Sequence, residues 1–144
     1  MPRIHIPAVL RRLVVERANG RCEYCLIHQD DVETAHHLDH IKPLKHGGLT
    51  ISENLALACQ LCNRYKGSDW AAADPLADAL TPLFNPRTQA WHEHFQWQGI
   101  EIVGISRAGR ATVELLRLNQ AVRLLDRERL SAAGRYPPVR IDDQ

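Results

Sequence analysis

Four cysteines stand in two pairs of the same spacing, Cys22-x-x-Cys25 and Cys59-x-x-Cys62, and they are all the cysteines of the chain. A tight turn between the members of such a pair lets both thiolates face one ion, so two pairs predict a tetrahedral Zn²⁺ site with Zn–S bonds of ~2.3 Å. Four protein ligands leave no position for a substrate, and the predicted zinc is therefore structural. Two disulfides are the alternative, and a chain of this size without a secretory signal favours zinc.

The zinc would hold the ends of a long insert, residues 26–58, and most of the polar chemistry of the chain lies in or just after that insert. The residues that stand out, in chain order, are Asp39-His40-Ile41-x-Pro43, Gly47-Gly48, Asn54-Leu55, Cys59-x-x-Cys62-Asn63 and Lys66-Gly67.

In order and in spacing these residues resemble the HNH endonucleases, over roughly residues 20–70. The resemblance implies a ββα-metal core, in which a hairpin and a helix surround one divalent ion. It also implies an endonuclease that leaves a 5′-phosphate and a 3′-hydroxyl.

The resemblance assigns a role to four side chains. His40 would be the general base that activates water against the scissile phosphate, a task that suits a near-neutral imidazole. Asp39 and Asn63 would bind the catalytic ion, which would stabilise charge on the phosphate and on the leaving oxygen. Asn54 would orient the loop and the His40 ring through hydrogen bonds.

The chain departs from the family pattern at the third signature position, where Asn63 stands in place of the frequent histidine. An amide oxygen binds Mg²⁺ or Mn²⁺ and is a poorer ligand for Zn²⁺ or Ni²⁺, so we expect Mg²⁺ or Mn²⁺ as the catalytic ion. The adjacent pair His36-His37 is a second departure, and His37 either joins the site or is an ordinary surface histidine. Lys66 is either a solvated cation at a helix end or a phosphate contact.

The other histidines carry no such pattern. His5, His28 and His46 read as surface or capping residues. His92-x-His94 lies in a segment with strand-like alternation, where paired histidines are more often exposed than bound to a metal.

The first half of the chain contains elements that can position these residues. Residues 34–41 predict a short strand that ends before Pro43, and residues 60–66 predict a short helix. Ser52 is a plausible N-cap of a helical turn that carries Asn54 and Leu55. Residues 7–18 predict an amphipathic helix; the face expected to pack on the zinc module is Val9 or Leu10, Leu13, Val14 and Arg17.

The second half has a different pattern. Residues 68–90, with Pro75, Pro82 and Pro86, predict an irregular wrap, and residues 91–103 predict a β-hairpin. Residues 106–130 have the apolar spacing of a helix that begins at Ser106 and breaks at Asn119. The fold class is therefore α+β, a single domain over 1–144 with a nuclease core at 20–70 and a wrap, hairpin and Arg-rich helical tail at 71–144.

The composition of the 144 residues is that of a globular protein, with 44% hydrophobic and 24% charged residues and a net charge of +1. Such a balance does not by itself indicate a nucleic-acid binder. Between Ser106 and Tyr136 there are nevertheless seven arginines: Arg107, Arg110, Arg117, Arg123, Arg127, Arg129 and Arg135. They form either a solvated helix face or an arm that contacts phosphates, and the nuclease core favours DNA contact.

The sequence therefore predicts a metal-dependent endonuclease that nicks or cuts DNA, with double-stranded DNA as its partner. No apolar run reaches the ~20 residues of a membrane span, and we expect a cytoplasmic protein. Two alternatives stay open: a non-catalytic zinc module that binds nucleic acid, and an RNase. A secreted toxin would need a delivery segment that the sequence does not show.

Overall fold

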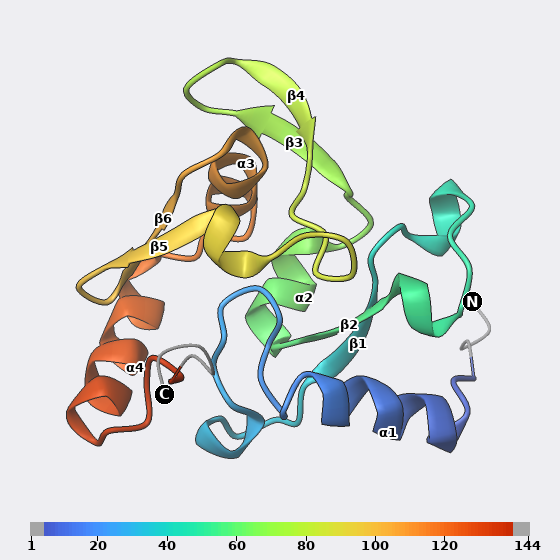
Figure 1. The fold of residues 1–144 in the computed structure, drawn as a ribbon, viewed down its shortest axis with the longest axis horizontal. Helices are drawn as coiled ribbons and strands as arrows, with labels where there is room; N and C mark the ends of the chain where they lie inside the picture. The colour runs from blue at the N-terminus through green and yellow to red at the C-terminus, as the bar shows by residue number, and fades with distance from the viewer. Residues whose placement is uncertain (1–4, 140–144) are drawn as a thin grey trace.

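The computed structural model describes residues 5–139, so both ends of the expected domain lie outside the described residues (Figure 1). Over this range the fold mixes four α-helices with three antiparallel pairs of strands, as the α+β prediction expects. The helices are α1 (Ala8–Arg17), α2 (Gln60–Lys66), α3 (Arg107–Leu115) and α4 (Ala121–Ala132). The paired strands are β1 (His37–His40) with β2 (Leu55–Ala58), β3 (Ala71–Asp74) with β4 (Ala79–Pro82), and β5 (Phe95–Gln98) with β6 (Glu101–Gly104).

Strands β1 and β2 run antiparallel, and α2 follows β2 directly. Strand β2 has the sequence Leu-Ala-Leu-Ala and is buried at every position. Its two leucines pack with Val14 of α1, whereas its two alanines belong to the main core on the opposite face. No alternation of polar and apolar residues marks this strand in the sequence, because both of its faces are buried.

Helix α1 covers the outer face of β2, with Val14 fully buried and Leu10 partly buried against it (Figure 1). The predicted packing face is wrong in part, since Leu13 is exposed, and of the alternatives Val9 and Leu10 it is Leu10 that packs. Arg17 fixes the end of the helix by donating hydrogen bonds to two carbonyl oxygens beyond it, those of Ser52 and Leu55.

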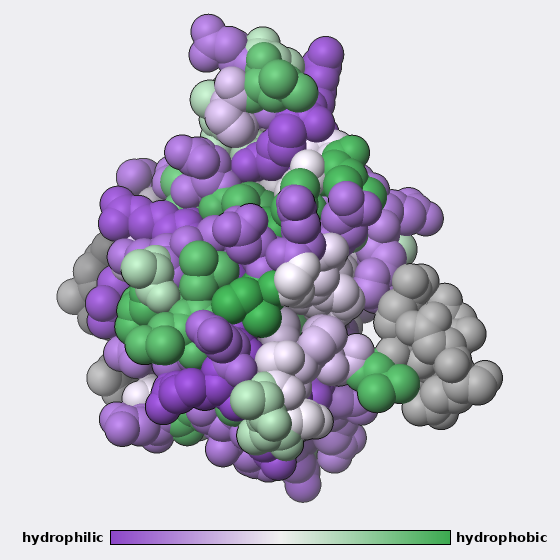
Figure 2. Space-filling view, turned by 90° about the vertical axis from the view of Figure 1, so that its left-hand side faces the viewer, coloured by the Kyte–Doolittle hydropathy of each residue, from purple (hydrophilic) through white to green (hydrophobic). Residues whose placement is uncertain are grey.

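The expected irregular wrap over 68–90 is wrong, because residues 71–82 form the β3–β4 hairpin. This hairpin projects from one end of the molecule, and Figure 2 shows apolar side chains at its tip. Leu80 on it is 80% exposed. Next to its turn Asp74 accepts from Arg110 of α3, with 2.8 Å between Nη2 and Oδ2. The ion pair therefore holds an exposed hairpin to the body of the protein.

The last part of the chain largely follows the prediction. Strands β5 and β6 form the expected hairpin, although Trp91–Glu93 is a 3₁₀ turn before it. Ser106 caps α3 by accepting from the amide of Gly109, and the chain breaks between α3 and α4 at Asn119. The Asn119 side chain bonds to both backbone groups of Ile102 in β6, which fixes the break against the hairpin.

One core joins the two halves of the chain. The cysteines and Tyr24 from the first half pack with Phe84, Phe95 and Leu116 from the second. None of the helices within residues 5–139 is long and apolar enough to cross a bilayer.

Candidate active site and metal centre

The two cysteine pairs meet in the core. All four residues are buried, all four thiols are free, and their Sγ atoms lie within 4.8 Å of one another. Cys25 and Cys59, one from each pair, have Sγ atoms 3.7 Å apart. A tetrahedral ion with Zn–S bonds of ~2.3 Å needs sulfur–sulfur edges of ~3.8 Å, so the donor set and its size fit zinc. No disulfide is present among the described residues.

Secondary structure places each pair. Cys22 and Cys25 flank a turn, and the amide of Cys25 points at the Cys22 sulfur, 3.5 Å away. Cys59 is the N-cap of α2, and its sulfur accepts from the amide of Cys62 at 3.4 Å. Amide groups that face a sulfur favour its thiolate form, the form that binds a metal.

His40 is the last residue of β1 and is partly buried. Its Nε2 lies 2.9 Å from Oγ1 of Thr50, which fixes the ring and leaves Nδ1 as the other site for a proton. Burial lowers the pKa of His40 and the Lys66 cation adds to this, whereas the Asp39 carboxylate opposes it. The imidazole is therefore neutral at pH 7 and able to accept a proton.

Asp39 precedes His40 and points into the protein, where only 4% of the residue is exposed. Tyr24 donates to its Oδ2 at 2.8 Å, and the ammonium of Lys66 donates to its Oδ1 at 3.1 Å. Burial raises the pKa of Asp39 against the opposing effects of Lys66 and Tyr24. Both carboxylate oxygens are thus engaged by neighbouring side chains.

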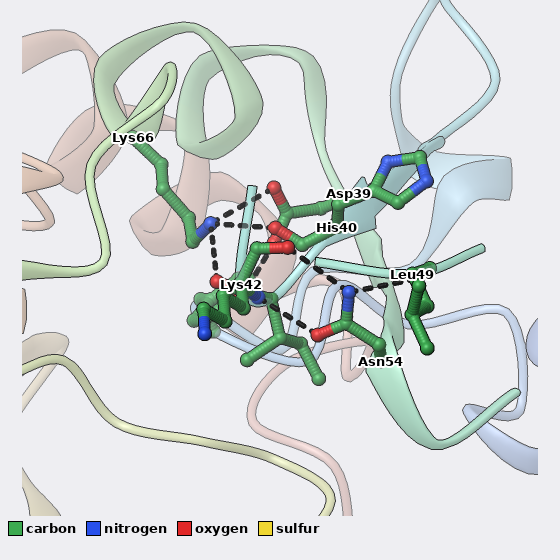
Figure 3. A network of polar contacts seen from close by, with 8 residues as sticks. Asp39, His40, Lys42, Leu49, Asn54 and Lys66 are labelled. Carbon is green, nitrogen blue, oxygen red and sulfur yellow. Dashed lines mark hydrogen bonds and ion pairs between the residues drawn. The ribbon is translucent and has the colours of Figure 1, made fainter. Parts of the chain in front are cut away.

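Lys66 ends α2 with only 1% of its surface exposed, so the expectation of a solvated cation is wrong. Its ammonium also donates to the carbonyl oxygens of His40 at 3.0 Å and Ile41 at 3.2 Å (Figure 3). A buried ammonium needs such partners, because leaving water without them is costly. Lys66 therefore joins α2 to the end of β1, the segment that carries His40.

Asn54 holds the loop that follows His40. Its Oδ1 accepts from the amide of Lys42 at 2.8 Å, and its Nδ2 donates to the carbonyl oxygens of Lys42 and Leu49 (Figure 3). Gly48 closes the same loop, since a Cβ there would lie 1.7 Å from the Lys42 carbonyl oxygen. The structure brings Asn54 to the loop as expected, whereas the His40 ring bonds to Thr50 instead.

Asn63 and His37 lie on the elements that flank Asp39. Asn63 is on α2 one turn before Lys66, which places the two residues on one side of the helix. His37 is in β1 opposite Ala58, and its Nε2 is buried without a hydrogen-bond partner. Both residues are partly buried.

These positions coincide with a family match: the family model of the HNH endonuclease matches residues 22–69. Residues 22–69 are thus similar to an HNH endonuclease domain, and we refer to this segment as the HNH domain. Over 118 residues the chain is also 25% identical to the Septu protein PtuB of Bacillus thuringiensis. That similarity covers 81% of this chain and 43% of the relative, so the chain spans less than half of the relative's length. No solved structure gives a significant match.

The HNH domain is attached to the tail through Arg123 of α4, which is 5% exposed. Its Nη2 lies 3.0 Å from Sγ of Cys62 and 3.7 Å from Sγ of Cys59, and its Nη1 donates to the carbonyl of Leu116. Four thiolates and one Zn²⁺ would carry a net charge of −2, so a buried guanidinium beside them offsets part of that charge.

The expectation that the tail arginines form a solvated face or a phosphate arm is wrong for several of them. Arg127 is buried and donates to the carbonyls of Ile100 and Leu118, and Arg110 pairs with Asp74. Arg135 pairs with Asp31. These guanidinium groups hold the tail together and to the HNH domain.

The histidines outside the motif have structural partners. His36 bonds through Nε2 to the carbonyl of Ile27, and His28 accepts from the amide of Asp30. His94 bonds to Ser106, and His92 packs against Trp91 and Trp97. Within residues 5–139 the cysteines form the single group of three or more metal-binding side chains. The expectation of exposed strand histidines is wrong, since His92 and His94 are partly buried and precede the strand.

Sequence reasoning missed Tyr24, Thr50 and Arg123. Tyr24 lies between Cys22 and Cys25, at a position for which the zinc motif specifies no residue type. Its hydroxyl contacts Asp39, so it links the metal centre to the strand that carries His40. Arg123 reaches Cys62 across 61 residues, and no local pattern announces a contact of that range.

Proposed function

We propose that this protein is a metal-dependent endonuclease that uses its HNH domain to hydrolyse phosphodiester bonds in DNA. The observation that carries the proposal is an imidazole at the end of β1 that bonds to Thr50, next to the buried Asp39–Lys66 pair and to the loop that Asn54 fixes. A rigid, neutral histidine beside a carboxylate is what general-base hydrolysis requires.

In this proposal the Nδ1 atom of His40 takes a proton from the attacking water. Thr50 holds Nε2 and so keeps the ring in one orientation during the transfer. Asn54 fixes the two ends of the loop from Lys42 to Leu49 by its hydrogen bonds to their carbonyl oxygens. General-base catalysis of this kind contributes about 10²–10⁴-fold to a rate.

We propose Asp39 and Asn63 as the protein ligands of one catalytic Mg²⁺ or Mn²⁺ ion, in a ββα-metal arrangement. When bound, such an ion stabilises the charge that develops on the phosphate and on the leaving oxygen. A carboxylate and an amide supply the hard oxygen donors that these ions prefer. Because Lys66 donates to Oδ1 of Asp39 and Tyr24 donates to Oδ2, an ion bound to Asp39 would share an oxygen with one of these donors or displace it.

We propose that the four cysteines hold a structural Zn²⁺. The ion would join the turn at Cys22 to the start of α2 at Cys59 and thereby set the distance between β1 and α2. The burial of all four cysteines in the core supports a role in folding rather than in catalysis.

Cleavage of a supercoiled plasmid tests the nuclease. We expect purified, zinc-loaded protein to relax or linearise the plasmid with Mg²⁺ or Mn²⁺ and not without an added divalent ion. His40→Ala is expected to lose about 10²–10⁴-fold in rate, because the base is removed. His5→Ala is the matched control, since His5 is an exposed histidine outside the HNH domain and is expected to leave the rate unchanged.

The same assay separates the alternatives. Cleavage of RNA with an intact plasmid would identify an RNase. Binding of nucleic acid without cleavage in Mg²⁺, Mn²⁺ or Ni²⁺ would identify a binding module. In either case the proposal of a DNA endonuclease would be wrong.

A further inference from the structure

An exposed tryptophan contacts a lysine and a histidine of the loop that follows His40. Trp70, just after α2, is 44% exposed. The ammonium of Lys42 lies 5.2 Å from the centroid of its ring, and the ring of His46 lies 6.4 Å away. We refer to Lys42, His46 and Trp70 as the Trp70 platform.

The platform is held on both sides of the candidate site. Lys42 is bonded through both of its backbone groups to Asn54, and the Trp70 carbonyl accepts from the amide of Leu83 at 3.0 Å. Lys66 connects the two sides, because its ammonium binds the His40 and Ile41 carbonyls just before Lys42. The aromatic ring is therefore presented by fixed backbone.

The platform is also close to the base. Lys42 is two residues after His40, so their Cα atoms are at most about 7 Å apart. One strand of B-DNA carries a phosphate every ~3.4 Å along the helix axis. A strand whose scissile phosphate lies at His40 would thus bring a neighbouring nucleotide to the platform.

The other tryptophans are not available in this way. Trp91 donates its indole N–H to the carbonyl of Tyr24, and Trp97 donates to the hydroxyl of Tyr136. Both lie within the aromatic core of the tail. Among the large apolar residues that are exposed within residues 5–139, Trp70 is the single aromatic one.

We propose that the Trp70 platform binds one unpaired nucleobase of the substrate strand, stacked on the exposed part of the Trp70 ring, while Lys42 pairs with the adjacent phosphate. This inference rests on the proposed function, which places the scissile phosphate at His40. The substrate class is then single-stranded nucleic acid or a duplex that is locally open next to the cut.

Stacking explains why the base must be unpaired. A base in a duplex is covered on both faces by its neighbours, whereas a free base can place one face on an indole ring. Such stacking contributes ~1–3 kcal/mol per base and tolerates any sequence. The platform therefore selects strand state rather than sequence.

Binding without cleavage tests the inference. In a His40→Ala background without added divalent ions, anisotropy would be measured with labelled single-stranded DNA, single-stranded RNA, duplex DNA and a bulged duplex of one sequence. We expect tighter binding of the probes with unpaired bases. Trp70→Ala should weaken that binding about 5- to 150-fold, the range that corresponds to stacking of one base, and should change duplex binding little.

Three further variants sharpen the test. Trp70→Phe retains an aromatic face and should keep most of the affinity. Lys42→Gln should reduce the salt dependence by about one phosphate contact. Leu80→Ala, at a more exposed apolar position on the β3–β4 hairpin, should leave binding unchanged.

The inference is wrong if Trp70→Ala binds unpaired probes as tightly as the parent does. It is also wrong if the parent binds duplex DNA best and Trp70→Ala weakens duplex binding as much as it weakens the binding of unpaired probes. Cleavage by protein with His40 intact keeps this result separate from the nuclease proposal. If the parent protein cuts the plasmid and Trp70→Ala binds unpaired probes normally, the platform proposal is wrong and the nuclease proposal is supported. If unpaired probes bind through Trp70 and nothing is cut, the nuclease fails instead.

Discussion

Two regions of this molecule are rich in cations, and they use them in opposite ways. In the loop after β1, Lys42 and Lys45 are exposed and follow His40 in the chain. In α4, Arg123 and Arg127 are buried, with every named contact inside the protein. The difference shows that the number of positive charges in a segment does not predict where a phosphate binds, whereas their burial and partners do.

The side-chain chemistry accounts for the difference. A guanidinium presents five donors in a planar fork and can satisfy several carbonyls and thiolates at once. Arg127 makes three such contacts, to Ile100, Leu118 and Asn119. A lysine at the surface is a hydrated point charge that remains free to meet a phosphate. We therefore expect variants of the two regions to fail in different assays.

The largest expected effect comes from breaking the metal centre to which both regions are joined. Cys59→Ser should abolish cooperative unfolding of the whole chain, because zinc binding and folding are linked and contribute ~10–16 kcal/mol in zinc-finger peptides. Arg123 contacts the Cys59 and Cys62 sulfurs, so α4 should lose its anchor as well. Thermal melting with a zinc assay measures this, and native melting of the variant would refute the structural role.

The next largest effect is a difference in stability between variants of a buried and of an exposed arginine in the tail. Arg123→Met should destabilise the protein by about 3–5 kcal/mol, since it leaves buried thiolates without their cation. Zinc should also pass faster to a chromogenic chelator. Arg129→Met is the matched control: its side chain is 72% exposed beside Asp126, and the change should stay within about 0.5 kcal/mol. Equal urea midpoints for the two variants would contradict the assignment.

The smallest effect concerns His40, which precedes the lysine-containing loop, and appears in the pH dependence of kcat/KM. Burial and Lys66 lower the pKa of His40 below 6.5. The neutral, basic form therefore persists to lower pH, and the acidic limb of kcat/KM should lie below pH 6.5. Rates from pH 5 to pH 8 in Mg²⁺ measure the limb. An acidic limb centred above pH 6.5 would show that the pKa of His40 is not lowered in the working enzyme.

The sequence predicted what depends on local patterns. The cysteine spacing, the strand up to His40 and the helix from Gln60 to Lys66 agree with the structure, because turns, caps and apolar periodicity are written in neighbouring residues. The site roles of Asp39 and Asn63 came from resemblance and stay predictions.

What the sequence could not predict depends on contacts between distant segments. Strand β2 reads as a plain apolar run, because α1 and the main core bury both its faces. The partner of Lys66 lies 27 residues away, so a lysine at a helix end reads as solvated. The prolines at 75 and 82 hid a hairpin, since Pro82 occupies the end of β4 and Pro75 lies beyond β3.

Chemical rescue tests the central claim that His40 is the base most directly. His40→Gly should fold and bind zinc but should not cleave DNA in Mg²⁺, and added imidazole should restore part of the cleavage by supplying the missing base. Undiminished cleavage by His40→Gly without imidazole would contradict the account.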